Sequence, residues 1–309
     1  MSVGSFERGG LWRRVQEVTR RALAGGALVP IPTTGERVLD GGVEFLVRVA
    51  TSLKRRDEER EQRDLRGPQD TAAALRPPPN PFLPYDEALF VADVSETHVG
   101  LLNKFNVVEH HLLIVTRDFV DQARLMDEAD FAALWSCLGE VDGLGFYNGG
   151  ETAGASQPHK HLQLVPLPFA AQGPRIPLEP AWERAVFARG VGTSPALPFR
   201  HALARVEGVA GMPGGEAAAL LLERYHLLLA AVGRGAERRS PSARQPGPYN
   251  LLLTREWMLV VPRAVERFGA VSLNALAFAG SLFVRDAEQL EALRAAGPMR
   301  ALCAVVGGG

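Results

Sequence analysis

The stretch Ser156-Gln157-Pro158-His159-Lys160-His161-Leu162-Gln163-Leu164-Val165-Pro166 spaces two histidines and a glutamine two residues apart. In an extended strand, side chains alternate between the two faces, so His159, His161 and Gln163 form a row on one face. Lys160 and the leucines lie on the other face. Buried imidazoles and carboxamides need hydrogen-bond partners, so this row fills a core poorly and favours a chemical site.

Small residues lead into this strand. The run Tyr147-Asn148-Gly149-Gly150-Glu151-Thr152-Ala153-Gly154-Ala155 contains three glycines. A backbone without bulky side chains can approach an anion closely and cradle it with N–H groups. The turn and the strand together therefore predict a phosphate beside the two imidazoles.

The row has three interpretations. It can be a pair of hydrogen-bonded structural histidines, or it can hold a metal ion, since histidines two apart on a strand can ligate one ion. The metal interpretation needs a third ligand, for which the candidates are His98, His110 and His111. In the third interpretation one imidazole attacks a phosphorus, and a hydrogen bond to its other nitrogen fixes its tautomer. The residues alone leave the metal and nucleophile interpretations about equal.

Composition narrows the class of protein. The 309 residues are 46% hydrophobic and 22% charged, which supports a sizeable core and argues against global disorder. A net charge of -1 gives no whole-chain case for nucleic acid or an anionic membrane. Cys137 and Cys303 are too few for a disulfide framework and favour the reducing cytoplasm. Residues 1–10 lack the apolar core of a signal peptide, and no apolar run reaches the length of a membrane span.

Hydrophobic periodicity predicts strands interspersed with helices. Asp127, with Asp130 three residues later, predicts the capped start of a helix. Further helices are expected over residues 11–24 and 216–232. Strands are expected within 38–52 and over 88–94, 98–102, 110–116 and 143–148, with a hairpin formed by 249–254 and 257–261.

A short internal echo suggests a fused duplication. Phe105-Asn106-Val107-Val108 followed by residues 112–117 resembles Tyr249-Asn250-Leu251-Leu252 followed by residues 258–263. In such a duplication only the first copy carries the histidine strand. A monomer could then supply the two halves of a sheet.

Resemblance separates the two interpretations that the residues leave equal. Gly154-Ala155-Ser156-Gln157-Pro158-His159-Lys160-His161-Leu162-Gln163 resembles the active-site strand of the histidine-triad (HIT) superfamily, in the His-x-His-x-Gln form of its nucleotidyltransferase branch. Other segments, in the right order, are similar to the diadenosine tetraphosphate phosphorylases (ATP adenylyltransferases): residues 80–84, 97–99, 102–107, 109–117, 249–255 and 257–263.

This resemblance implies an α+β fold, a HIT-like antiparallel sheet flanked by helices. It implies a catalytic region over residues 1–168 and a C-terminal region over 169–309 that completes the fold. The implied reaction is phosphorolysis of diadenosine tetraphosphate (Ap4A) to ATP and ADP through an adenylyl-histidine. His161 is the expected nucleophile, His159 supports it through its backbone carbonyl, and Gln163 bonds a phosphate oxygen. A carboxamide cannot shuttle a proton, which fits transfer to an acceptor that is already an anion.

The resemblance also implies the substrate-binding residues, which are Lys54, Asn103, Lys104, Asn148, Gly154, Ala155, Ser156 and Gln157. No metal ligand and no tightly bound cofactor are expected, and whether a divalent cation (Mg²⁺ or Mn²⁺) accompanies the polyphosphate stays open. The expected partners are small molecules (Ap4A, phosphate, ATP and ADP), without nucleic acid or membrane, and the protein is expected to be a monomer. Lys160 is expected to take no part in catalysis. His98, His110 and His111 are expected to be structural, and Cys137 a core residue.

Other activities stay open at this point. A hexose-1-phosphate uridylyltransferase shares the His-x-His-x-Gln pattern, but its usual cysteine and histidine metal ligands are poorly matched by Cys137 and Cys303. Sulfate could replace phosphate as acceptor, as in an ADP-forming sulfate adenylyltransferase, and a related nucleoside monophosphate transferase or hydrolase is also conceivable. A non-enzymatic alternative is a metal- or nucleotide-binding sensor.

Overall fold

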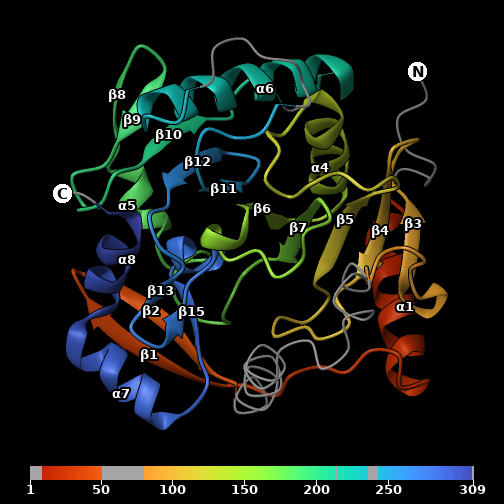
Figure 1. Ribbon diagram of the computed structural model, residues 1–309, viewed down its shortest axis with the longest axis horizontal. Coiled ribbons are helices and arrows are strands. Elements are labelled where there is room, and N and C mark those ends of the chain that lie inside the picture. Colours follow the sequence, from red (N-terminus) through yellow and green to blue (C-terminus); the bar gives the residue numbers. More distant parts are fainter. Residues whose placement is uncertain (1–8, 51–79, 210, 213, 236–242, 308–309) are drawn as a thin grey trace, which may run out of the picture.

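One long antiparallel sheet organises the chain (Figure 1). The computed structural model describes residues 9–50, 80–209, 211–212, 214–235 and 243–307. Within this part, antiparallel strands pair in the order β3-β4-β5-β7-β6-β11-β12-β10-β9-β8. They are β3 (Phe90–Asp93), β4 (His98–Leu102), β5 (Leu112–Thr116), β6 (Gly143–Gly149), β7 (His161–Pro166), β8 (Val186–Ala188), β9 (Val191–Thr193), β10 (Ala202–Arg205), β11 (Tyr249–Leu253) and β12 (Trp257–Pro262).

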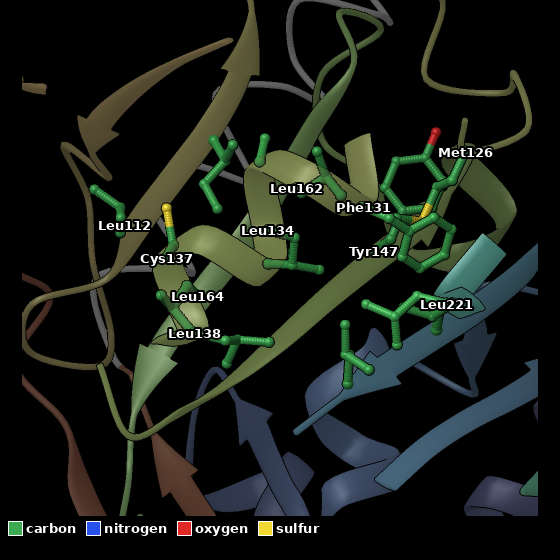
Figure 2. Close-up of a cluster of buried hydrophobic side chains, with 14 of the residues drawn as sticks. Leu112, Met126, Phe131, Leu134, Cys137, Leu138, Tyr147, Leu162, Leu164 and Leu221 are labelled. Atoms are coloured by element: carbon green, nitrogen blue, oxygen red, sulfur yellow. The ribbon is translucent and has the colours of Figure 1, made fainter. Parts of the chain in front are cut away.

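Helices cover one face of this sheet. They are α1 (Leu11–Ala24), α4 (Glu128–Glu140) and α6 (Gly214–Ala231), and they share a buried apolar cluster with alternate residues of the strands. Figure 2 shows Leu134, Cys137 and Leu138 of α4 packed beside Leu162 and Leu164 of β7. Cys137 is therefore a core residue, as predicted, and burial raises its pKa to about 12. The predicted α+β fold, an antiparallel sheet flanked by helices, is confirmed.

A smaller sheet packs against the opposite face. It is formed by β1 (Thr34–Asp40), β2 (Val43–Val49) and β15 (Ser281–Val284), and α7 (Ala287–Ala296) and α8 (Pro298–Val306) pack beside it (Figure 1). The expectation of one strand within 38–52 was wrong. The chain reverses at Gly41-Gly42, with φ values of +59° and +77° that suit glycine, so the pattern spans a hairpin.

The shorter elements connect these layers. They are η1 (Glu87–Leu89), η2 (Glu151–Ala153), α5 (Glu179–Glu183), β13 (Arg267–Phe268), β14 (Val271–Ser272) and η3 (Ala275–Ala279). The turn η2 follows β6 directly, and η3 lies against β6 and β11. These two short elements therefore bring the glycine-bearing turn and the C-terminal half of the chain together.

The long sheet contains the same arrangement of strands twice. In chain order, β3-β4-β5-α4-β6-β7 is followed by β8-β9-β10-α6-β11-β12. Counted inward from the two edges of the sheet, the strands of the two halves occupy corresponding positions. The halves meet where Asn148 of β6 pairs with Asn250 of β11, each preceded by a tyrosine. The strand order therefore contains a duplication, but the sequence echo joined the wrong segments. It matched β5 to β12, whereas β12 corresponds to β7.

This correspondence explains why only one half carries the histidine row. It places Val261 of β12 at the position of His161 in β7. Val261 is fully buried in the core beneath the smaller sheet. On the same face of the first half, Leu113 and Val115 belong to a much smaller apolar cluster. The second half has therefore become core, while the first half keeps polar side chains on that face.

Several local predictions are confirmed. Helix α1 spans the predicted residues, and β11 and β12 form the predicted hairpin. Helix α4 starts at the predicted capping box, with Asp130 N donating to Asp127 Oδ1 at 3.1 Å and Asp127 N donating to Asp130 Oδ2 at 2.8 Å. None of the helices in the described ranges is both long and apolar enough to cross a membrane. The division into 1–168 and 169–309 stays a prediction.

Candidate active site

The histidine row lies at the start of β7, which pairs with β5 and β6 in the first half of the sheet. His161 pairs with Val115 of β5, and Gln163 pairs with Leu113 of β5 and Phe146 of β6, so both side chains lie on one face. His159 precedes the strand and forms an isolated bridge to Asp121. The ring of Phe82 lies 5.6 Å from the ring of His159 and 5.5 Å from that of His161. The structure therefore brings the three predicted catalytic residues together, although the strand itself begins only at His161.

The imidazole of His161 has one engaged nitrogen and one open nitrogen. Nδ1 lies 2.7 Å from the carbonyl oxygen of His159, and because a carbonyl only accepts, Nδ1 carries the proton. Nε2 therefore presents a lone pair, and none of the described residues hydrogen-bonds to it. Burial, together with the nearby His159 ring, lowers the pKa of His161 to about 4, although the bond to the carbonyl opposes this. The ring is thus neutral near pH 7.

His159 is held in the opposite tautomer. Its Nε2 lies 2.8 Å from the carbonyl oxygen of Thr116, so Nε2 is the donor, and Nδ1 accepts from Asn80 Nδ2 at 2.9 Å. Burial lowers the pKa of His159. Both ring nitrogens of His159 are therefore engaged, and its contact with the His161 ring is made through its backbone oxygen.

Gln122 fixes the backbone of His161 and was missed by the sequence analysis. His161 N donates to Gln122 Oε1 at 2.8 Å, and Gln122 Nε2 donates to Asn148 O at 2.9 Å and to His161 O at 3.2 Å. The carboxamide therefore links β7 to β6 beside the imidazole. No pattern pointed to it, because Gln122 lies 39 residues from His161 in a loop.

His111 and Gln163 are in direct contact, which the sequence analysis also missed. His111 Nε2 lies 3.0 Å from Gln163 Oε1, and Asn103 Nδ2 lies 3.2 Å from His111 Nδ1. His111 was expected to be structural, and its ring contacts the Gln163 carboxamide of the row. In the sequence, the one indication of this contact was that His111 directly precedes the apolar strand β5.

The other two histidines lie away from the row. His98 Nε2 bonds Asp130 Oδ1 at 3.1 Å beneath the sheet, and His110 Nδ1 lies 3.1 Å from the hydroxyl of Thr19 in α1. Neither can complete a metal site with His159 and His161. In the described part of the chain, no group of three or more histidine, cysteine, aspartate or glutamate side chains is suited to hold a metal ion.

Lys160 points to the opposite face, as strand alternation predicted. It is 2% exposed, and its Nζ bonds Asp130 Oδ2 at 2.5 Å and the carbonyl oxygen of Leu125 at 2.8 Å. The ammonium group is therefore a buried link between β7 and α4, on the side of the sheet away from His161.

Asn148 of β6 links the start of the glycine-bearing turn to the C-terminal half of the chain. Asn148 Oδ1 accepts from Ala275 N at 2.9 Å and from Asn250 Nδ2 at 2.8 Å. Gly154 has a φ of +91°, and a Cβ there would lie 2.8 Å from Cβ of Asn274, so only glycine fits without movement. The three residues that follow differ in exposure: Ala155 is buried, Ser156 is exposed and Gln157 is half-buried.

A buried arginine braces this turn from the second half of the chain. Arg263 is fully buried and donates to Asn250 Oδ1 at 2.7 Å and to Leu273 O at 2.9 Å. Asn250 Nδ2 in turn donates to Ala153 O at 2.8 Å. Burial lowers the pKa of Arg263 to about 10. Arg263 directly follows β12, at the position that corresponds to Gln163 of β7, so the second half supports the site of the first.

The remaining predicted residues are less tightly gathered. Asn103 follows β4, and its Oδ1 accepts from Phe105 N at 3.3 Å. Lys104 is exposed, with its Nζ 5.9 Å from the centre of the Phe105 ring. Lys54 lies outside the described residues.

Two family models together match most of the chain. A family model described as the Ap4A phosphorylase N-terminal domain matches residues 2–184, and one described as the ATP adenylyltransferase C-terminal domain matches residues 195–307. Diadenosine 5',5'''-P1,P4-tetraphosphate phosphorylase 2 of Saccharomyces cerevisiae is 29% identical over 283 residues, which cover 75% of this chain and 82% of the yeast protein.

Solved structures share the fold. The crystal structure of yeast Ap4A phosphorylase Apa2 aligns with a TM-score of 0.76 at 24% identity, over 97% of this chain and 95% of that one. The structure of Apa2 in complex with Ap4A aligns with a TM-score of 0.71 at 22% identity, over 97% and 98% of the two chains.

Proposed function

This chain belongs to the Ap4A phosphorylase family, and we propose that it carries out its reaction through an adenylyl group bound covalently to His161. It is a nucleotidyltransferase that phosphorolyses Ap4A, and its substrates are small nucleotides. One observation carries the proposal: His161 Nδ1 is committed to the His159 carbonyl, so the lone pair of Nε2 is available on the site face.

The first step forms the bond between His161 Nε2 and the α-phosphorus of Ap4A. The bond from that phosphorus to the bridging oxygen breaks, and ATP leaves with the electron pair of that bond. The imidazole gains positive charge as it attacks, and its Nδ1–H donates more strongly to the His159 carbonyl as that charge grows. No proton has to leave His161, because its nucleophilic nitrogen carries none.

The second step is the reverse displacement by inorganic phosphate. A phosphate oxygen attacks the adenylyl phosphorus, the bond to Nε2 breaks, and ADP leaves. Phosphate is already an anion near pH 7 and needs no general base. The Gln163 carboxamide supplies a hydrogen bond to a phosphoryl oxygen, which is positioning and charge stabilisation rather than proton transfer.

The turn after β6 is proposed to hold the polyphosphate. Asn148 anchors the turn, and the backbone of Gly154, Ala155, Ser156 and Gln157 is proposed to cradle the phosphates. Lys54, Asn103 and Lys104 are proposed nucleotide contacts. A divalent cation, Mg²⁺ or Mn²⁺, is proposed to arrive with the polyphosphate rather than as a resident cofactor.

Three wider properties are also proposals. A monomer is supported by the duplicated half-sheets, which together complete one sheet within a single chain. The net charge of -1 supports activity without nucleic acid or an anionic membrane. The free cysteines Cys137 and Cys303 fit a reducing compartment such as the cytoplasm.

The covalent intermediate is tested by incubating the protein with Ap4A in the absence of phosphate. We expect the intact mass to increase by one adenylyl group and peptide mapping to place that group on His161. Adding phosphate should discharge the group as ADP. A protein that turns over Ap4A with phosphate but never carries the group at any quench time would contradict the proposed mechanism.

The lowered pKa of His161 predicts an unusual pH profile. The neutral ring is the nucleophile, so the rate of adduct formation should stay level from pH 8 to about pH 5 and fall only as pH approaches the His161 pKa of about 4. An ordinary histidine would begin to lose activity near its usual pKa of about 6.5. Rapid-quench measurements over this range check the profile, with circular dichroism at each pH to exclude unfolding. A midpoint near 6.5 in folded protein would show that the ring is not neutralised by burial.

A further inference from the structure

We propose that Asn103 and His111 are positioning residues that fix which end of the Gln163 carboxamide faces the transferred phosphoryl group. The inference rests on the proposed role of Gln163 as a hydrogen-bond donor. A carboxamide has an accepting oxygen and a donating nitrogen of nearly the same size, so packing alone does not choose between its two orientations. Something in the site must make the choice.

A chain of hydrogen bonds, starting from the backbone, makes that choice. Phe105 N can only donate, so the Asn103 atom 3.3 Å from it is Oδ1 and the Asn103 nitrogen points to His111. That nitrogen donates to His111 Nδ1 at 3.2 Å, which leaves the ring proton on Nε2. His111 Nε2 then donates to Gln163 Oε1 at 3.0 Å. Each bond thus sets the donor and acceptor of the next.

The result is that Gln163 Nε2, the donating end, is left for a ligand. Among the described residues, no hydrogen bond uses this nitrogen. A reversed carboxamide would bring its NH₂ group against the N–H of His111, and two donors would face each other. Because Gln163 and His161 lie on the same face of β7, the donating nitrogen belongs to the site in which the phosphoryl group is transferred.

The surroundings hold His111 in the state that the chain requires. A protonated imidazole would carry N–H on both nitrogens and could not accept from Asn103. Burial is the main cause that lowers the pKa of His111 to about 4, and the nearby His161 adds to the effect while the bond to Gln163 opposes it. Asn103 N also donates to the His111 carbonyl at 2.9 Å, so the turn between β4 and β5 is closed by the same two residues.

The first test replaces His111 with phenylalanine, which keeps a ring but removes both hydrogen bonds. We expect kcat for phosphorolysis of Ap4A to fall about 10- to 100-fold, part of the loss expected when one transition-state donor is removed, with a much smaller change in KM. His111→Gln restores an amide donor toward Gln163 and should recover most of the rate. His110→Phe is the matched control, since His110 contacts Thr19 rather than the row, and it should keep the wild-type kcat.

A double-mutant cycle separates positioning from a merely structural role. In a Gln163→Ala background there is no carboxamide left to orient, so His111→Phe should reduce kcat by less than about twofold further. An equal loss in both backgrounds, or a His111→Gln variant as slow as His111→Phe although its thermal unfolding matches wild type, would overturn the inference. The double-mutant cycle measures kcat and does not depend on detecting the adduct. Failure of the wild type to form adenylyl-His161 would therefore refute the covalent mechanism and leave this test intact.

Discussion

Replacing His161 with alanine lowers kcat for phosphorolysis of Ap4A by about 10⁴-fold or more, on the order of what removal of a covalent nucleophile costs elsewhere. His159 cannot take its place, because His159 Nε2 donates to the Thr116 carbonyl and its Nδ1 accepts from Asn80. Radiolabelled Ap4A and phosphate give the rate, and intact mass gives the adduct, which should be missing.

Nucleotide binding separates loss of the nucleophile from loss of the site. An equilibrium titration with Ap4A should show that His161→Ala still binds it, since the turn after β6 is anchored through Asn148 and not through the imidazole. His226→Ala removes an equivalent ring from the exposed side of α6 and should leave the rate unchanged. If the His161→Ala protein phosphorolyses Ap4A at the wild-type rate, another group is the nucleophile.

Strand periodicity was sufficient to place His161 and Gln163 on one face and Lys160 on the other. It could not separate a metal site from a nucleophile, because both need imidazoles at this spacing. The distinction depends on which ring nitrogens are engaged: both nitrogens of His159 are hydrogen-bonded, whereas His161 leaves Nε2 open, so the two imidazoles are not both free to ligate one ion. A side-chain pattern contains no information about these contacts.

The contacts of the supporting residues could not be predicted from the sequence, for a different reason. Gln122 and His111 reach the row from 39 and 52 residues away, through contacts made only when the sheet forms. The duplication was suspected from the wrong pair of segments, because Val261 stands at the position of His161 in the second half and the two strands share little sequence. What survives is the tyrosine–asparagine pair at the junction of the halves, Tyr147-Asn148 and Tyr249-Asn250, where both copies still meet.

Asp130, His98 and Lys160 form a buried network on the helix-covered side of the sheet. This network is expected to affect the stability of the fold more than the rate of the reaction. Asp130 lies at the start of α4 and accepts from His98 in β4 and from Lys160 next to β7. Lys160 and Asp130 have side chains that are 2% and 1% exposed. Burial alone would raise the pKa of Asp130, but the hydrogen bond from His98 and the charge of Lys160 lower it overall. The network therefore holds a helix and two strands through one ionised carboxylate.

Replacing Lys160 with methionine should cost about 3–5 kcal/mol of unfolding free energy, because it leaves the Asp130 carboxylate buried without its cation. Urea unfolding followed by circular dichroism measures this loss. The matched control is Arg37→Met, which breaks the half-exposed pair between Arg37 and Glu44 and should cost at most about 1 kcal/mol. Below its unfolding transition, the Lys160→Met protein should retain the wild-type kcat, since the ammonium group faces away from His161.

The double variant Lys160→Met with Asp130→Asn identifies the cause of that loss. Removing both charges leaves no uncompensated ion, and an asparagine oxygen can still accept from His98, so the double variant should lose less than the sum of the two single changes. Additive losses would mean that the side chains stabilise the fold by packing alone.

The pH dependence of the unfolding free energy should follow the ionisation of the Asp130 carboxylate. Because the pKa of Asp130 is lower in the folded state, its contribution is complete above the ordinary carboxyl pKa and is lost as pH falls toward the lowered value. Asp130→Asn should therefore flatten the acid side of the stability profile.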